Sequence, residues 1–340
     1  MKKQMKFKTK KVPVILALII TFVILQAGCG TEEEISDTGF YLDTTCTITL
    51  YDINKDEGEK LIKKSFDICK KYEGLMSKTI KGSDIDRINR AEGKAVSASP
   101  ETIKVIKEGM RMGKLSRGEF DITIGRVTEL WDFNSDEAKV PDDEEIKEAL
   151  ETVDYRNIKI EGNNVTLKDP EAKLDLGGIA KGYIADRITK MLVKNGAEKA
   201  IINLGGNVVA IGEKEENTPW NIGVERPYSD RSEVIGVVEA VDDSVVTSGI
   251  YERFFEKNGK KYHHILDPET GYPAESDLEA VTVTGPLGHS MECDALSTVC
   301  ILMGEKKAKK IIESMDGMEG LFINKENKAT PTKGLSFVIQ

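Results

Sequence analysis

Cysteine, histidine and tryptophan are scarce in this chain of 340 residues, which contains five, three and two of them. There is no C-x-x-C pair and no histidine at metal-ligand spacing from a cysteine, so neither a zinc site nor a disulfide framework is expected. Apart from Cys29, the cysteines at positions 46, 69, 293 and 300 are expected to be small buried residues.

Positive charge is also in deficit, because the formal net charge is −10. Six lysines lie in the first eleven residues, with no acid among them, so the charge of −10 becomes −16 without them. A nucleic-acid-binding domain needs a basic patch, and this balance argues against one. An anionic ligand would need local positive groups or a metal ion.

The apolar run at residues 12–25 is short for a membrane-spanning helix, which needs about 20 residues. It follows the lysine cluster and leads into Ala-Gly-Cys29, the pattern of an export signal over residues 1–28. The site resembles that of bacterial lipoproteins, although Gln26 stands where leucine is usual. We therefore expect a lipid on Cys29, which places the protein on the outer face of the cytoplasmic membrane. An uncleaved N-terminal anchor is the alternative.

The apolar patterns predict fold class. Helical spacing dominates the first third and short strands the last half, without a repeat or clean linker between them. We expect one α+β domain around a largely antiparallel sheet with flanking helices at residues 40–340, after a polar tether at 29–39. Helices are expected at 54–72, 84–91, 99–116, 289–303 and 306–315. Strands are expected at 46–51, 158–160, 165–167, 174–176, 200–204, 208–211, 220–225, 234–241, 244–248 and 280–284. Residues 119–125 are expected to form a strand or tight turn, and the acidic stretch up to 145 to be exposed.

Residues 174–182 are organised as a short strand with Asp175, a turn at Gly177 and Gly178, and the start of a helix. A helix start offers free N–H groups and the positive end of the peptide dipoles, and phosphate often binds there. Lys181 adds a mobile positive charge. An ordinary Gly-Gly turn with a solvated lysine fits this stretch equally well.

Asp294 and Thr298 lie four residues apart on an expected helix, so their oxygens share one face. Hard oxygen ligands suit Mg²⁺. A solvated carboxylate and a threonine bonded to a backbone carbonyl are the alternative. His263 and His264 face opposite sides of an expected strand, so one of them could face a site.

Five stretches occur together in one order, at residues 175–182, 203–207, 247–249, 264–271 and 294–298. With residues 120–125 before Trp131, this series resembles the ApbE family of FAD:protein FMN transferases. The resemblance extends from Phe40 to the C-terminus.

The resemblance implies an enzyme that binds FAD, uses Mg²⁺ and moves FMN onto a Thr or Ser hydroxyl of an exported or membrane-bound flavoprotein, releasing AMP. It places the metal ligands at Gly178, through its carbonyl, and at Asp294 and Thr298. It places FAD contacts at Glu119, Phe120, Asp121, Asp175, Lys181 and Ile265. Leu42 and Thr79 stand where the family has a methionine and an aromatic residue.

The group that takes the acceptor's proton stays open. His264 is a candidate, because imidazole titrates near neutral pH. Two other functions remain possible for the same site. One is a Mg²⁺-dependent FAD pyrophosphatase that forms FMN and AMP, and the other is a flavin-binding lipoprotein that catalyses nothing.

Overall fold

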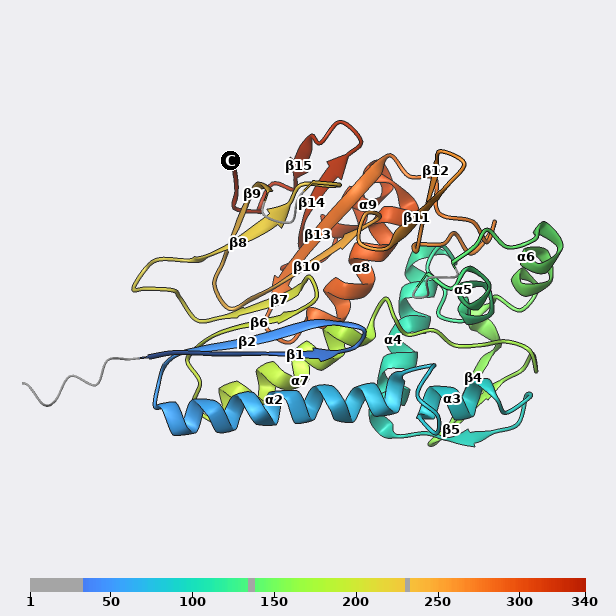
Figure 1. The fold of residues 1–340 in the computed structure, drawn as a ribbon, viewed down its shortest axis with the longest axis horizontal. Helices are drawn as coiled ribbons and strands as arrows, with labels where there is room; N and C mark the ends of the chain where they lie inside the picture. Colours follow the sequence, from blue (N-terminus) through green and yellow to red (C-terminus); the bar gives the residue numbers. More distant parts are fainter. Residues whose placement is uncertain (1–32, 134–137, 230–232) are drawn as a thin grey trace, which may run out of the picture.

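The fold is built on an eight-stranded sheet in which every pair of neighbours is antiparallel (Figure 1). The computed structural model describes residues 33–133, 138–229 and 233–340, so the expected signal and Cys29 lie outside the described residues. The strands, in order across the sheet, are β1 (Glu33–Tyr41), β2 (Thr44–Ile53), β6 (Lys199–Leu204), β7 (Asn207–Ile211), β10 (Asp243–Gly249), β13 (Leu278–Pro286), β14 (Glu319–Asn324) and β15 (Ala329–Pro331). This confirms the predicted α+β class with a largely antiparallel sheet.

Strand β1 corrects the expected tether at residues 29–39. From Glu33 onward this segment pairs with β2, up to the Tyr41–Thr44 pair. β1 is an edge strand with one largely exposed face, so its sequence is polar enough to resemble a linker. Its Ile35 lies against α2, where a Cβ built on Gly58 would be 2.5 Å from the Ile35 side chain. The folded part of the chain therefore includes these residues.

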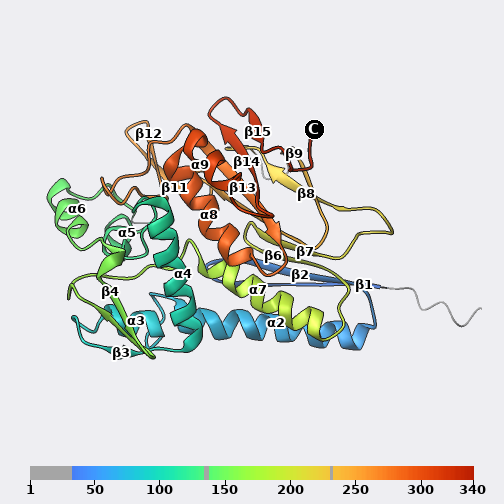
Figure 2. The ribbon, with the colours of Figure 1, turned by 180° about the vertical axis from the view of Figure 1, so that it is seen from behind.

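Helices cover one face of the large sheet, as the view from behind shows (Figure 2). They are α2 (Lys55–Met76), α7 (Ala180–Lys194), α8 (Ser290–Met303) and α9 (Glu305–Ile312), and α4 (Pro100–Ser116) packs against α8. The main core lies between these helices and the sheet and includes Ile48, Ile184 and Val299. The cysteines at 46, 69, 293 and 300 are buried with free thiols, as expected. None of the helices within the described residues is both long and apolar enough for a membrane span.

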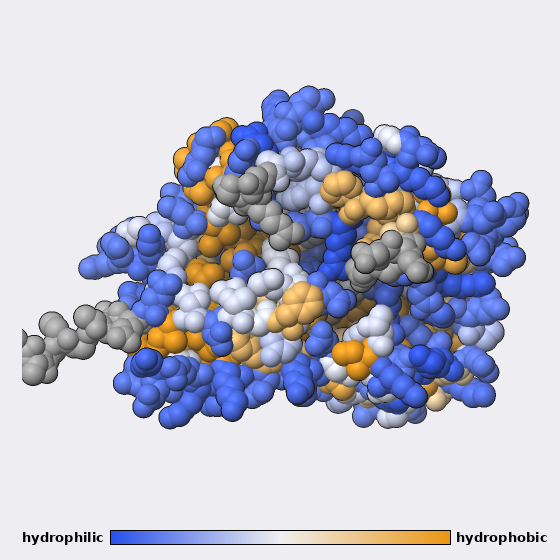
Figure 3. Space-filling model, viewed as in Figure 1, coloured by the Kyte–Doolittle hydropathy of each residue, from blue (hydrophilic) through white to orange (hydrophobic). Residues whose placement is uncertain are grey.

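A three-stranded sheet packs on the other face, with the strand order β16 (Phe337–Ile339), β9 (Val234–Ala240) and β8 (Trp220–Glu225). Trp220 and Val238 pack there against Val245 and Ile323 of the large sheet. The exposed surface on this side is mostly hydrophilic, with apolar patches and a hollow near its centre (Figure 3).

The remaining elements lie beyond the end of the large sheet near α4 (Figures 1 and 2). They are α3 (Asp84–Asn89), β3 (Val96–Ser97), α5 (Gly125–Trp131), α6 (Asp143–Leu150), a 3-10 turn (Tyr155–Asn157), β4 (Ile158–Glu161), β5 (Asn164–Leu167), β11 (Phe254–Lys257) and β12 (Lys260–His263). The sequence did not predict α5 or α6. Helix α6 begins within the acidic stretch. The capping box of Asp142 and Glu145 fixes where the helix starts, and Ile146 and Ala149 are buried, so the helix packs against the core.

Candidate active site

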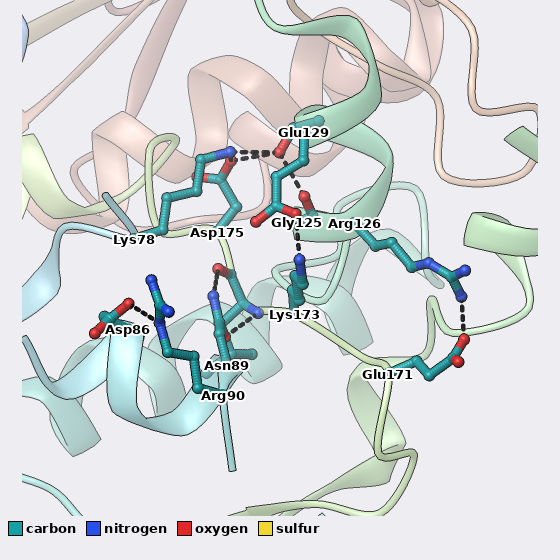
Figure 4. Close-up of polar contacts among 12 residues, drawn as sticks. Lys78, Asp86, Asn89, Arg90, Gly125, Arg126, Glu129, Glu171, Lys173 and Asp175 are labelled. Atoms are coloured by element: carbon teal, nitrogen blue, oxygen red, sulfur yellow. Dashed lines mark hydrogen bonds and ion pairs between the residues drawn. The ribbon is translucent and has the colours of Figure 1, made fainter. Parts of the chain in front are cut away.

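Asp175 lies in an extended segment that leads into the Gly177-Gly178 turn and α7. The expected strand at residues 174–176 is wrong, because this segment has no ladder of strand pairs. Instead, the Asn89 side chain accepts a hydrogen bond from Leu174 N (2.7 Å) and donates one to Leu174 O (2.9 Å) (Figure 4). Asp175 N donates to Ile122 O at 2.8 Å, from the turn at residues 119–125. A side chain thus satisfies backbone groups that a neighbouring strand would otherwise bond.

The Asp175 carboxylate is held by three donors. Its Oδ2 accepts hydrogen bonds from Lys78 Nζ (Figure 4) and Thr128 Oγ1, both at 2.8 Å. Its Oδ1 accepts one from Gly177 N at 2.8 Å. Burial raises the pKa of Asp175, but the charge of Lys78 and these hydrogen bonds outweigh it and hold the pKa at about 2. Asp175 is therefore ionised at neutral pH.

Asp294 on α8 faces the start of α7. Its Oδ2 accepts a hydrogen bond from Gly182 N at 2.9 Å, and its side chain is 3% exposed. Lys181 Nζ lies 3.5 Å from Asp294 Oδ1 and 3.4 Å from Gly177 O, so it connects the carboxylate with the glycine turn. The predicted helix after this turn is confirmed as α7.

Gly178 and Thr298 also meet at this point. A Cβ built on Gly178 would lie 3.7 Å from Thr298 Oγ1 and 3.3 Å from the Phe120 ring. Thr298 Oγ1 lies 3.4 Å from Ser248 Oγ. The structure therefore brings the three predicted metal ligands together. Asp294 and Thr298 offer side-chain oxygens, and Gly178 offers its backbone carbonyl.

The donor set suits a hard cation. Across the described parts of the chain, no three His, Cys, Asp or Glu side chains gather where they could hold a metal ion. One carboxylate, one hydroxyl and one backbone carbonyl are all oxygen donors, which Mg²⁺ prefers. Mg²⁺ usually keeps several waters and takes substrate phosphates as further ligands, and a protein donor set this small therefore fits it. Of the two Asp294 carboxylate oxygens, Oδ1 is the less engaged, because its contact with Lys181 is long, whereas Oδ2 accepts the hydrogen bond from Gly182 N.

The predicted FAD contacts in the turn at residues 119–125 differ in their surroundings. Phe120 is 6% exposed and lies against Gly178. The Asp121 carboxylate is buried and already accepts hydrogen bonds from Thr123 N, Thr123 Oγ1 and Tyr155 N. Glu119 is half-buried, with Oε1 3.8 Å from Lys307 Nζ. Only Phe120 of this group is placed directly at the glycine turn.

His264 lies next to Arg253, whose carbonyl is 3.2 Å from the imidazole Nδ1. A carbonyl only accepts hydrogen bonds, so Nδ1 carries the hydrogen and Nε2 is left as the acceptor. Burial, helped by the charge of Arg253, lowers the pKa of His264 to about 3. The expectation that this imidazole titrates near neutral pH is therefore wrong. Its neighbour Ile265 is buried at 5% exposure.

The chain is similar to known proteins over most of its length. The profile of the ApbE family matches residues 42–322. The chain belongs to the ApbE family. An FAD:protein FMN transferase of Treponema pallidum is 30% identical over 338 residues, covering 94% of this chain and 93% of that protein. One of Klebsiella pneumoniae is 35% identical over 270 residues, covering 78% and 83%.

Solved ApbE structures share the fold. The ApbE protein of Thermotoga maritima aligns with a TM-score of 0.80 at 32% identity, covering 88% of this chain and 97% of that one. The flavin transferase ApbE of Vibrio cholerae aligns with a TM-score of 0.78 at 28% identity, with the same coverage. The helices that position Lys181 and Asp294 therefore belong to a fold shared with ApbE proteins.

Two positions depart from the ApbE pattern. Leu42 lies in the β1–β2 turn with a φ of 57°, and its N–H donates to Glu73 Oε1 at 2.7 Å. Thr79 is exposed in the loop between α2 and α3, where its Oγ1 lies 3.0 Å from Ser77 Oγ. Neither side chain offers the flexible thioether or flat ring that the resemblance implies at these positions.

Sequence reasoning missed Lys78 and Thr128, which both contact Asp175. Lys78 is 97 positions from Asp175 in the sequence, and no spacing or motif connects them. Thr128 is on α5, a helix that the sequence did not predict. The only available signal was the position of Lys78 next to Thr79, a residue already assigned to the ApbE site.

Proposed function

We propose that this chain is an FAD:protein FMN transferase that acts on exported or membrane-bound flavoproteins. In this reaction a Thr or Ser hydroxyl oxygen of the acceptor bonds to the FMN phosphorus of FAD. The bond from that phosphorus to the bridging oxygen breaks, AMP leaves with this oxygen, and the hydroxyl proton is released. The single observation that carries the proposal is the meeting of Gly178, Asp294 and Thr298 with Lys181 at the start of α7. The names of the relatives agree with it.

The proposed metal is Mg²⁺, held by Asp294 Oδ1, Thr298 Oγ1 and the Gly178 carbonyl. Bound to the pyrophosphate, this ion would offset negative charge that resists attack and that builds up on the leaving AMP. Asp294 is well suited to the role because its other oxygen, Oδ2, is fixed by Gly182 N. The carboxylate is thereby oriented by the crossing of two helices rather than by a loop.

Other residues of this chain would bind and orient FAD. The Lys181 ammonium can bind a phosphate oxygen, since its contacts at 3.4 and 3.5 Å are long for hydrogen bonds. Phe120 and Ile265 supply buried apolar surface. Neutral His264 can accept a hydrogen bond from the acceptor hydroxyl at Nε2 and so orient it.

The test compares AMP release with and without an acceptor domain that exposes a Thr or Ser. We expect the acceptor to accelerate AMP release and to gain the mass of one FMN through a bond that survives denaturation. In-gel flavin fluorescence and mass spectrometry measure the product, and a Thr/Ser→Ala acceptor is the control. AMP release that no acceptor changes would favour FAD hydrolysis. Bound FAD with no AMP under any condition would favour a flavin carrier.

We also propose that the protein is lipid-anchored through Cys29 at the outer face of the cytoplasmic membrane. The lysine-rich start, the apolar run at residues 12–25 and the Ala-Gly-Cys29 sequence support this proposal. Mass spectrometry of the membrane fraction is expected to find a diacylglyceryl group on an N-terminal Cys29. A Cys29→Ala variant should remain unprocessed or leave the membrane. Mature protein that still begins at Met1 would contradict the proposal.

A further inference from the structure

Lys78 is a charged residue at this site to which no role has been given above. It lies in the loop between α2 and α3, and its Nζ donates to Thr128 Oγ1 at 2.6 Å and to Asp175 Oδ2 at 2.8 Å (Figure 4). The side chains of Lys78 and Asp175 are only 23% and 19% exposed. One ammonium thus connects the α2–α3 loop, helix α5 and the segment before the glycine turn.

Each neighbouring ion pair in Figure 4 has at least one partner that is more exposed than either member of the Lys78–Asp175 pair. Arg90 is 73% exposed opposite Asp86 at 7%, Glu171 is 66% exposed opposite Arg126 at 26%, and Glu129 is 42% exposed opposite Lys173 at 35%. Exposed pairs contribute little, because water screens them and long side chains lose freedom. A partly buried pair is stronger, and removing one partner leaves the other charge uncompensated. Lys78 is therefore more than a surface lysine.

The two lysines of the site have separate partners. Lys181 contacts Asp294 and the Gly177 carbonyl, whereas Lys78 contacts Asp175 on the other side of the turn. With Oδ2 occupied by Lys78 and Thr128, Asp175 presents Oδ1 to Gly177 N at 2.8 Å. The sequence of contacts runs from Lys78 through Asp175 to the backbone of the Gly177-Gly178 turn.

We infer that Lys78 is a positioning residue for FAD: it fixes the orientation of Asp175 and, through the Gly177 N–H, the glycine turn on which FAD binds. The inference rests on the proposed function for the identity of the ligand. Lys78 supports the binding surface and does not take part in the transfer step. Its loss is expected to affect FAD affinity far more than the rate of transfer at saturating FAD.

The test measures FAD affinity by isothermal titration in the presence of Mg²⁺, without an acceptor, for Lys78→Met and Lys78→Arg. Lys81→Met is the matched control, because Lys81 is exposed in the same loop. We expect Lys78→Met to raise the FAD Kd about tenfold, the scale of one charge-assisted hydrogen bond. Lys78→Arg should recover most of the affinity, and Lys81→Met should match the wild type. Circular dichroism melting curves confirm that each variant is folded.

A second comparison uses the Asp175→Asn background. If Lys78 acts through Asp175, adding Lys78→Met to Asp175→Asn changes the Kd by less than about twofold, because the effects of coupled residues are not additive. Transfer assays should show a raised KM for FAD in Lys78→Met and a kcat within about threefold of the wild type.

Three results would overturn the inference. Lys78→Met could bind FAD as tightly as Lys81→Met, or the tenfold loss could persist in the Asp175→Asn background. A wild-type protein that binds no FAD would overturn both this inference and the proposed function. A wild-type protein that binds FAD but modifies no acceptor would overturn the transferase proposal alone, since the affinity comparison would stand.

Discussion

Replacing Asp294 by alanine is expected to lower FMN transfer on the order of 10³-fold at ordinary Mg²⁺. Losing a residue that only supports a metal ligand lowers metal affinity or activity roughly 10- to 100-fold. We expect a larger loss for Asp294, because it is the one carboxylate in the proposed ligand set. The alanine variant also leaves Gly182 N, now bonded to Asp294 Oδ2 at 2.9 Å, without its acceptor. The measurement is the initial rate of FMN attachment to an acceptor domain across a Mg²⁺ titration.

Asp294→Asn is the control that separates charge from structure, because its amide oxygen can still accept from Gly182 N. We expect it to melt like the wild type and still to lose most transfer. Thr298→Ala should be milder, about tenfold, since a neutral hydroxyl binds a divalent ion less strongly than a carboxylate. Its neighbour Ser297, whose Oγ lies 2.7 Å from Ser248 Oγ, provides the matched Ser297→Ala control. Full transfer by Asp294→Asn at low Mg²⁺ would remove Asp294 from the metal site.

The elements predicted well were those with a strong local pattern. The alternation at residues 46–51 became β2, and the helical spacing at 54–72 became α2, which is capped by the Asn54 side chain. Such patterns record which face of an element is buried, so they need no knowledge of distant residues. The same holds for the hairpin of β4 and β5.

The elements predicted wrongly depend on partners that lie outside the segment itself. β1 is a strand because β2 pairs with it, although its own residues are mostly polar and exposed. The segment at 174–176 is apolar enough for a strand, but the Asn89 side chain occupies the place of a pairing strand. Nothing within either segment distinguishes these outcomes.

In the site, too, some features could be predicted from the sequence and others depend on the fold. Gly178, Asp294 and Thr298 were assigned by family resemblance, and the fold brings them together from the two helix regions of α7 and α8. The low pKa of His264 follows from burial, which residue type alone does not reveal. The role of Lys78 depends on an ion pair between a loop and a segment far away in the sequence.

Gly182→Ala is expected to have a large effect on both stability and transfer, because α7 and α8 touch at this residue. A Cβ built on Gly182 would lie 2.2 Å from Ser290 O and 2.6 Å from Met291 Cα. Both atoms belong to the backbone of α8, so no side-chain rotation can make room. The helices must separate, and we expect a loss of about 3 kcal/mol in the free energy of unfolding.

Gly74→Ala is the matched control, since Gly74 is also inside a helix but has nothing within 4 Å of the added methyl group. It should stabilise the protein by about 0.5–1 kcal/mol, because alanine favours helix. Urea unfolding measures stability, and flavinylation measures transfer. Gly182→Ala with wild-type stability would contradict the close contact between α7 and α8. Separating the helices also moves Lys181 and the Gly178 carbonyl away from Asp294, so transfer should fall at least about 100-fold, even at temperatures where the variant remains fully folded.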